Sequence, residues 1–106
     1  MNLLFVCSRN RRRSPTAEQV YSGRPGLCVM SAGTAPDAEV VVSADLVEWA
    51  DVIFAMEPVH RTRLNRDFSA LLKNKRVVVL GIRDRYTFMD SRLVVLLESK
   101  VCPHIR

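Results

Sequence analysis

Cysteines, aromatic side chains and long apolar segments are scarce in this sequence, and each scarcity excludes a class of protein. The 106 residues include three widely spaced cysteines, which fit neither a disulfide framework nor a zinc-binding pattern. No apolar run could span a bilayer, and the segment before Cys7 is too short for the core of a signal peptide. Aromatic residues make up 7% of the chain, too few to interleave with basic residues as base-stacking platforms. We expect a cytoplasmic protein with no metal or other cofactor and no membrane or nucleic-acid partner.

The composition is that of one compact domain covering residues 1–106. Hydrophobic residues make up 48% and charged residues 25%, a balance typical of folded, water-soluble proteins. Lysine and arginine number 16 against 11 acidic residues, which gives a formal net charge of +5 and favours anionic partners. The basic residues are unevenly placed, since Arg9, Arg11, Arg12 and Arg13 closely follow a cysteine.

Four short apolar segments alternate with segments of helical character. We expect strands at 2–6, 27–31, 51–56 and 76–80, because each is a nearly continuous apolar run. Ser14 is expected to cap a helix that starts with Pro15 and ends before Gly23, and Ser43 to cap a short second helix. Two further helices are expected at 58–72 and 91–101. This alternation predicts a three-layer αβα fold around a four-stranded parallel sheet.

The loop between the first strand and the first helix has the features of an anion site. Such loops lie at the carboxyl edge of a parallel sheet, where backbone N–H groups and the helix N-terminus converge. Cys7 begins the loop and Arg13 ends it. A thiolate, the nucleophilic form of cysteine, is stabilised by a helix N-terminus and nearby arginines, and arginine binds two phosphate oxygens at once. The phosphate-binding residues are therefore expected to be Ser8, Arg9, Asn10, Arg11, Arg12, Arg13 and Ser14.

This interpretation competes with a simpler one, in which Cys7 is a small buried hydrophobe and the arginines form a solvated patch. The order of strand, cysteine, loop, Arg13 and helix favours the phosphate site. Attack of Cys7 on phosphorus would then give a phosphocysteine that water hydrolyses.

The segment Leu3-Leu4-Phe5-Val6-Cys7, then Asn10, then Arg13-Ser14-Pro15-Thr16-Ala17-Glu18, resembles the low-molecular-weight protein tyrosine phosphatase family, whose signature is Val-Cys-x-x-Asn-x-x-Arg-Ser-Pro-x-Ala-Glu. Residues 31–34 resemble that family's Ser-Ala-Gly-Thr turn, and residues 51–56 its Asp-x-Ile-x-x-Met stretch. The resemblance implies a flavodoxin-like fold and hydrolysis of phosphotyrosine, with inorganic phosphate as product. It also implies that Cys7 is the nucleophile, that Arg13 binds phosphate, that Asn10 braces the loop and that Ser14 stabilises the thiolate.

Three features depart from that family's pattern. The chain is shorter than usual members, mainly between Gly33 and Asp51 and at the C-terminus, so walls that select the substrate are expected to be missing. Arg12 stands where the family often has a second cysteine, which removes a protective disulfide. The family's Asp-Pro pair, which carries the general acid, is replaced by the segment Arg83-Asp84-Arg85-Tyr86.

Two aspartates are candidates for the general acid that protonates the leaving oxygen. We favour Asp84 because it follows the fourth strand as the family's acid does. Asp90 is the rival, although its place before Ser91 suits a helix cap. Tyr86 is a candidate for lining the mouth of the site, with a surface position as the alternative.

The remaining conspicuous residues have simpler interpretations. We expect His60 on a helix surface, Trp49 in the core and Cys28 buried in a strand. The substrate would be a phosphorylated protein or a small phosphomonoester. One alternative is a phosphate- or phosphopeptide-binding module that has lost its acid. Another, arsenate reduction, is disfavoured because Cys28 and Cys102 are not placed as a resolving pair.

Overall fold

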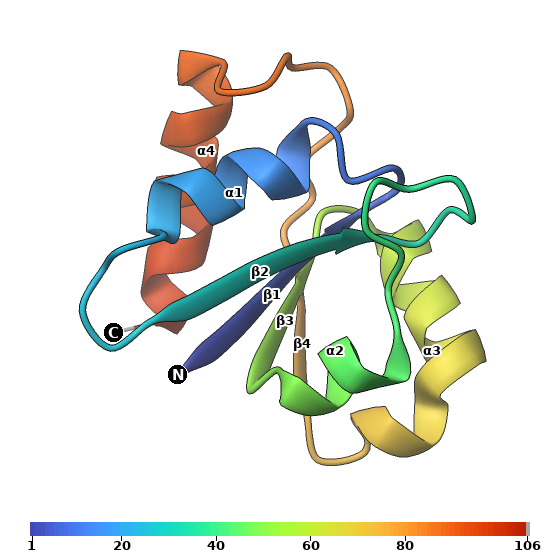
Figure 1. Ribbon diagram of the computed structural model, residues 1–106. Helices are drawn as coiled ribbons and strands as arrows, with labels where there is room; N and C mark the ends of the chain where they lie inside the picture. The colour runs from blue at the N-terminus through green and yellow to red at the C-terminus, as the bar shows by residue number, and fades with distance from the viewer. Residues whose placement is uncertain (106) are drawn as a thin grey trace.

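A four-stranded, all-parallel sheet forms the centre of the molecule (Figure 1). The computed structural model describes residues 1–105. The strands are β1 (Asn2–Cys7), β2 (Cys28–Gly33), β3 (Val52–Ala55) and β4 (Arg76–Val79), in the order β2-β1-β3-β4. The helices are α1 (Arg13–Tyr21), α2 (Ala44–Trp49), α3 (Pro58–Leu72) and α4 (Ser91–Val101), followed by a 3-10 turn, η1 (Cys102–His104).

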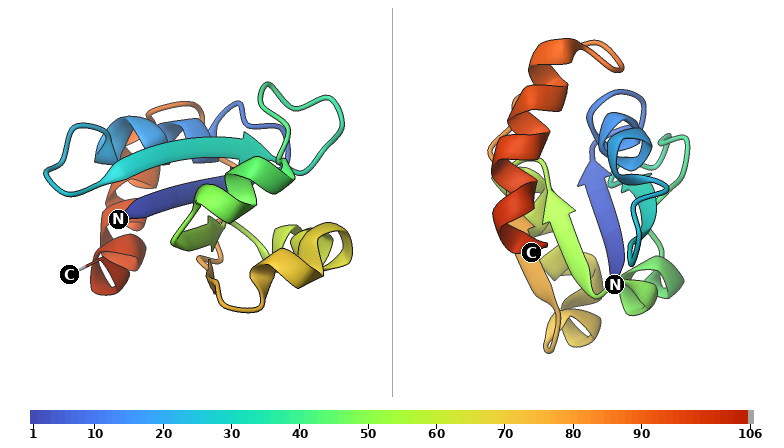
Figure 2. Two further views of the ribbon diagram at one scale, coloured as in Figure 1. Left: turned by 60° about the horizontal axis from the view of Figure 1, so that its bottom comes forward. Right: turned by 90° about the vertical axis from the view of Figure 1, so that its left-hand side faces the viewer.

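The helices cover both faces of the sheet, which confirms the predicted three-layer αβα fold. Figure 2 shows α1 and α4 on one face and α2 and α3 on the other. Alternate residues of β1 serve the two layers: Phe5 packs in the core under α1 and α4, and Val6 packs in the core under α2 and α3. Because β1 is buried on both faces, its apolar run is continuous.

The strand order places the loop after β1 at the point where the chain reverses its direction across the sheet. From β1 the chain moves outward to β2 and then crosses back to β3 on the other side of β1. In open parallel sheets, this switch point at the carboxyl edge is where ligands bind. The fold therefore brings the ends of β1 and β3, and the segments that come after them, to one place.

Two local predictions were wrong. Ser14 does not cap α1: the helix begins at Arg13, the N-cap position belongs to Arg12, and no side chain caps it. Ser14 and Pro15 are the second and third helical residues, and the first amides of α1 remain available for an anion. Cys28 is exposed rather than buried, because it starts the edge strand β2.

The burial of His60, near the start of α3, also differs from expectation. His60 was expected on the helix surface, but its side chain is completely buried. Trp49 packs against the core under α2 and α3, as expected. Within residues 1–105, no helix has the length and apolarity needed to cross a membrane, and no cluster of three or more His, Cys, Asp or Glu side chains could hold a metal ion.

Candidate active site

The carbonyl groups of the loop that connects β1 to α1 are hydrogen-bonded to the segment that follows β2. The carbonyls of Cys7, Ser8 and Arg9 accept hydrogen bonds from the amides of Thr34 (3.0 Å), Ala35 (2.9 Å) and Glu39 (3.1 Å). The amides of Ser8, Arg9, Arg11 and Arg12 donate to no group within residues 1–105. Unpaired amides beside a helix N-terminus form a site for an anion.

Gly33 allows this close contact between the loop and the end of β2. A Cβ atom at Gly33 would overlap the Ser8 carbonyl oxygen and would lie 2.7 Å from the Ala38 Cβ. Both contacts are far closer than van der Waals distance. The absence of a side chain at this position is therefore a condition for the observed loop geometry.

Cys7 ends β1 and lies in the wall of the cavity with 3% of its surface exposed. Its sulfur is 2.9 Å from the Ser14 hydroxyl oxygen and accepts the hydrogen of the Asn10 backbone amide, with a nitrogen–sulfur distance of 3.2 Å. Hydrogen bonds donated to sulfur favour the thiolate. The other two cysteines, Cys28 and Cys102, are also free and lie elsewhere.

Asn10 holds the loop from behind. Its side-chain amide donates two hydrogen bonds of 2.9 Å, one to the Ser14 hydroxyl and one to the Ser31 hydroxyl, which in turn donates to Glu18. Its φ of 57° is in the left-handed region, which asparagine tolerates better than most residues. Asn10 and Ser14 therefore support the loop through side-chain contacts and do not line the cavity.

Arg13 has a buried and firmly anchored guanidinium group. Its Nη1 atom donates to Glu57 at 2.5 Å and to the carbonyl of Ile82 at 2.7 Å. Its Nε atom lies 3.7 Å from a carboxylate oxygen of Asp84. The Nη2 atom donates to no group in the described part of the chain and is left for a ligand.

His60 connects the same loop to α3. Its Nδ1 atom accepts the amide hydrogen of Glu57 at 3.1 Å, so the proton of the neutral ring is on Nε2, which lies 2.9 Å from the Ser8 hydroxyl. Burial, together with the nearby Arg13 guanidinium, lowers the pKa of His60 to about 4. Glu57 is the N-cap residue of α3, and its side chain accepts the His60 backbone amide hydrogen in return. The neutral His60 ring thus holds Ser8, while Glu57 holds Arg13.

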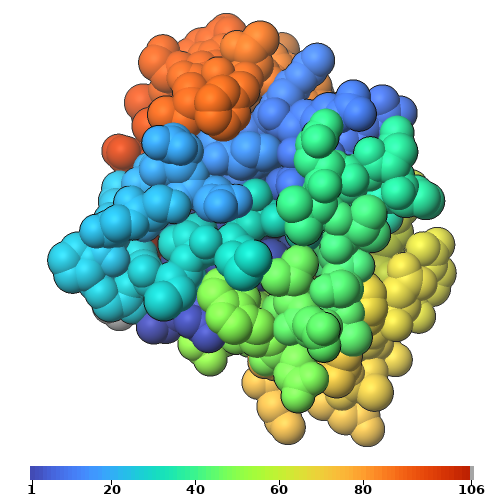
Figure 3. Space-filling view, in the orientation of Figure 1, coloured from blue at the N-terminus to red at the C-terminus, as the bar shows by residue number. Residues whose placement is uncertain are grey.

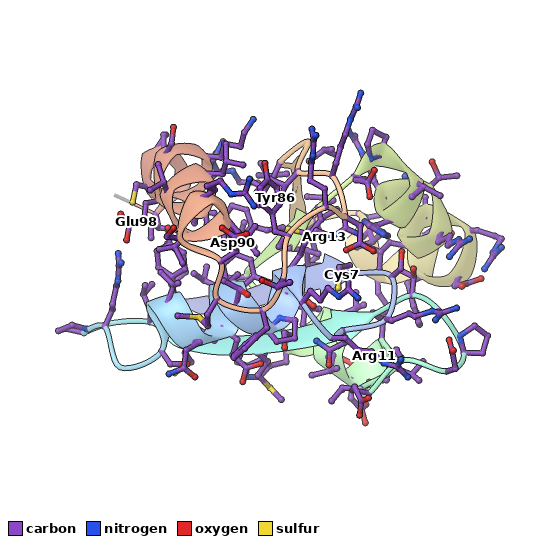
Figure 4. The ribbon with its side chains drawn as sticks, turned by 90° about the horizontal axis from the view of Figure 1, so that it is seen from above. Cys7, Arg11, Arg13, Tyr86, Asp90 and Glu98 are labelled. Carbon is purple, nitrogen blue, oxygen red and sulfur yellow. The ribbon has the colours of Figure 1, made fainter. Side chains whose placement is uncertain are left out.

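These groups surround a cavity of about 590 Å³. Cys7, Ser8, five arginines, Asp84, Ala35 and Pro36 line it. In Figure 4, which looks onto this edge, Cys7 and Arg13 lie between α4 and α3, and Arg11 points toward the loop after β2. The structure therefore brings Cys7, Arg13 and Asp84 together.

Asp90 and Tyr86 do not line this cavity. Asp90 caps α4: its carboxylate accepts the Arg92 amide hydrogen at 2.9 Å and pairs with the Arg92 guanidinium. That guanidinium also holds the pKa of Asp90 below its usual value. Tyr86 packs against the core under α1 and α4, with the Arg92 guanidinium 5.5 Å from its ring centre.

From the sequence, neither Glu57 nor Arg63 was placed at the site, and His60 was not expected to be buried. A signal for Glu57 existed, since it closely follows β3, and neighbouring parallel strands end at the same edge of the sheet as Cys7. Arg63 lies one turn beyond His60 on α3 and resembles any exposed helical arginine in the sequence.

Three solved structures that share this fold are named as phosphatases. The tyrosine phosphatase Wzb from Escherichia coli K30, in complex with phosphate, superposes with a TM-score of 0.75 at 18% identity, covering 96% of this chain and 94% of that one. A low-molecular-weight phosphotyrosine phosphatase from Vibrio cholerae O395 has a TM-score of 0.71 at 22% identity, with coverages of 96% and 92%. A YwlE arginine phosphatase, in a mutant with a phosphorylated active-site serine, has a TM-score of 0.74 at 22% identity, with coverages of 100% and 98%.

The chain thus has the fold of the low-molecular-weight protein tyrosine phosphatases, a flavodoxin-like αβα sandwich. Neither a protein-family model nor a curated protein matches its sequence.

Proposed function

We propose that this chain is a cysteine-dependent phosphatase that hydrolyses phosphotyrosine or a similar phosphomonoester. The surroundings of Cys7 carry the proposal: the Asn10 backbone amide donates to its sulfur, the Ser14 hydroxyl lies 2.9 Å from it, and an anchored Arg13 shares its cavity. The names of the fold relatives support phosphate-ester chemistry. The YwlE mutant with a phosphorylated active-site serine supports transfer of the phosphoryl group to a side chain of the enzyme.

In the first step, the Cys7 thiolate attacks phosphorus. The phosphorus–sulfur bond forms while the bond to the leaving oxygen breaks, and that oxygen receives a proton from Asp84. The loop amides and the Arg13 guanidinium bind the non-bridging oxygens, whose negative charge they stabilise in the transition state. Asp84 is assigned this role because, among the described residues, it is the acidic residue that lines the cavity.

In the second step, water attacks the phosphocysteine. The Asp84 carboxylate accepts a proton from the water, the new phosphorus–oxygen bond forms, and the Cys7 thiolate leaves. The product is inorganic phosphate, and both groups return to their starting states. No cofactor takes part in this sequence of steps.

The charge of the cavity favours a phosphomonoester over phosphoarginine, the substrate class suggested by the name of YwlE. Five arginines and one carboxylate line the cavity. The guanidino group of phosphoarginine carries positive charge that these arginines would repel, whereas an aryl or alkyl leaving group carries none. Like charges held close together oppose binding.

Turnover of an aryl phosphate tests the proposal. Cys7→Ser should abolish turnover while inorganic phosphate still binds, because Arg13 and the loop amides remain. Cys28→Ser is the matched control, since it removes an exposed thiol outside the cavity and should keep full activity. Phosphate binding without turnover in the unmodified protein would instead indicate a phosphate-binding module. Hydrolysis of phosphoarginine but not of the aryl phosphate would change the proposed substrate class to phosphoarginine.

The role of Asp84 is tested by the leaving group. Asp84→Asn should slow hydrolysis of phenyl phosphate by roughly 10²–10⁴-fold and that of nitrophenyl phosphate much less, since nitrophenolate leaves without protonation. Asp90→Asn is the comparison and should lower both rates slightly, through the lost cap of α4. The reverse pattern would transfer the role to Asp90.

A further inference from the structure

The cavity carries more positive charge than one phosphoryl group requires. Among the lining residues that the structure describes, Arg9, Arg11, Arg12, Arg13 and Arg63 are cations, and Asp84 is the one carboxylate. Arg13 and the free loop amides already account for a phosphoryl dianion. Unlike the buried Arg13, the other four arginines are exposed or half-buried, so we expect them to meet the remainder of the substrate.

Two of these arginines are already paired with the loop after β2. Arg9 lies 3.8 Å from Asp37, and Arg11 lies 3.3 Å from Glu39. Arg12 and Arg63 have no carboxylate within ion-pair distance among residues 1–105. Arg63 instead has only the Thr34 hydroxyl at 3.4 Å, and it is half-buried. An arginine in this position is available for an anion of the ligand.

Arg63 also lies where the cavity meets a second hollow of about 460 Å³. The two spaces share Arg63 and Pro36, and Val41 provides an apolar wall in the second one. This hollow lies between the loop after β2 and α3, which Figure 3 shows side by side on the surface. A substrate that extends from the phosphoryl site would therefore pass Arg63 and reach a partly apolar groove.

We propose that Arg63 binds the carboxylate of an acidic residue next to the phosphorylated residue, so that the substrate is an acidic phosphopeptide. The proposal rests on the proposed phosphatase function. The second hollow beside Arg63 favours a chain over a small molecule, because a small molecule would leave the groove at Val41 empty. The guanidinium can contact both oxygens of the carboxylate.

Matched phosphotyrosine peptides test this, with glutamate or glutamine placed on either side of the phosphotyrosine. The glutamate peptide should have a kcat/KM higher by roughly two- to fivefold, the range of a partly exposed arginine–carboxylate pair. Arg63→Gln should reduce this ratio to near one. Arg61→Gln, an exposed arginine of the same helix that lines neither hollow, is the control and should keep the wild-type ratio.

Binding to the Cys7→Ser variant separates this proposal from the proposed catalysis. A glutamate preference in peptide binding that Arg63→Gln removes would support the inference whether or not the wild type turns the peptides over. Equal affinity for both peptides would overturn it and leave the phosphatase proposal intact. A preference for a small bisphosphate, with no discrimination between the peptides, would assign Arg63 to a small polyanion and overturn the peptide proposal.

Discussion

Acidification should destabilise this protein through one buried histidine. His60 is fully buried, and burial together with Arg13 lowers its pKa to about 4. In the unfolded chain its pKa returns to about 6.5. Between these two values the unfolded state binds more protons than the folded state, so the free energy of unfolding rises with pH. The contribution of the neutral His60 to stability is therefore fully present above the pKa of the unfolded state and is lost as the pH falls toward the pKa of the folded state.

The two pKa values set the size of the effect. At a pH of about 4.5 the unfolded histidine is almost completely protonated and the folded one mostly neutral, which gives a loss of about 2 kcal/mol relative to neutral pH. Glu57, Asp84, Arg13 and Arg63 are the other charged groups that act on this ring. A comparison with a His60 variant cancels most of their contribution.

Urea unfolding followed by the fluorescence of Trp49, the single tryptophan, measures this loss at neutral and acidic pH. His60→Gln should be less stable at neutral pH but should lose about 2 kcal/mol less on acidification than the wild type. His104→Gln removes the other histidine and should retain the loss caused by His60. Equal losses in the wild type and in His60→Gln, or an NMR titration of the folded His60 ring near its ordinary value, would refute the reasoning.

Three further predictions concern the loop. Arg13→Lys should reduce kcat/KM nearly as much as Arg13→Ala, because an ammonium group cannot contact Glu57 and grip two phosphate oxygens together; steady-state kinetics measure this, and a larger loss in Arg12→Ala would refute the assignment of the loop. Gly33→Ala should lower kcat by roughly 100-fold by displacing the loop, with a calorimetric scan to check that the protein folds. Asn10→Ala should cost roughly 1–3 kcal/mol in urea unfolding, since it removes two hydrogen bonds to buried hydroxyls.

The strands and the place of the loop were predictable because their signals are local. An apolar run such as 3–6, followed by polar residues and a helix start, identifies a buried parallel strand and the loop at its carboxyl end. The residues Cys7 and Arg13 are then brought to one cavity by a single strand-to-helix connection. The expectation that Asp84 lies near them required the family resemblance, because that segment is distant in sequence.

The errors arose where tertiary contacts override local preference. Ser14 has the identity of a helix cap, but its hydroxyl is engaged by Cys7 and Asn10. His60 has the periodicity of a surface residue, yet the loop after β1 covers it, and no pattern within α3 indicates that. Cysteine is a residue type that is often buried, but Cys28 begins an edge strand. Such outcomes depend on which segments meet in space, which short-range patterns do not encode.

Detection of a phosphoryl group on Cys7 during turnover tests the central claim most directly. The enzyme is mixed rapidly with nitrophenyl phosphate, quenched in acid and digested, and the peptide that contains Cys7 is examined by mass spectrometry. We predict a phosphorylated Cys7 in the wild type and in Cys28→Ser, and none at this position in Cys7→Ala. Sustained turnover with the phosphoryl group on another residue, or turnover by Cys7→Ala, would contradict the proposed mechanism.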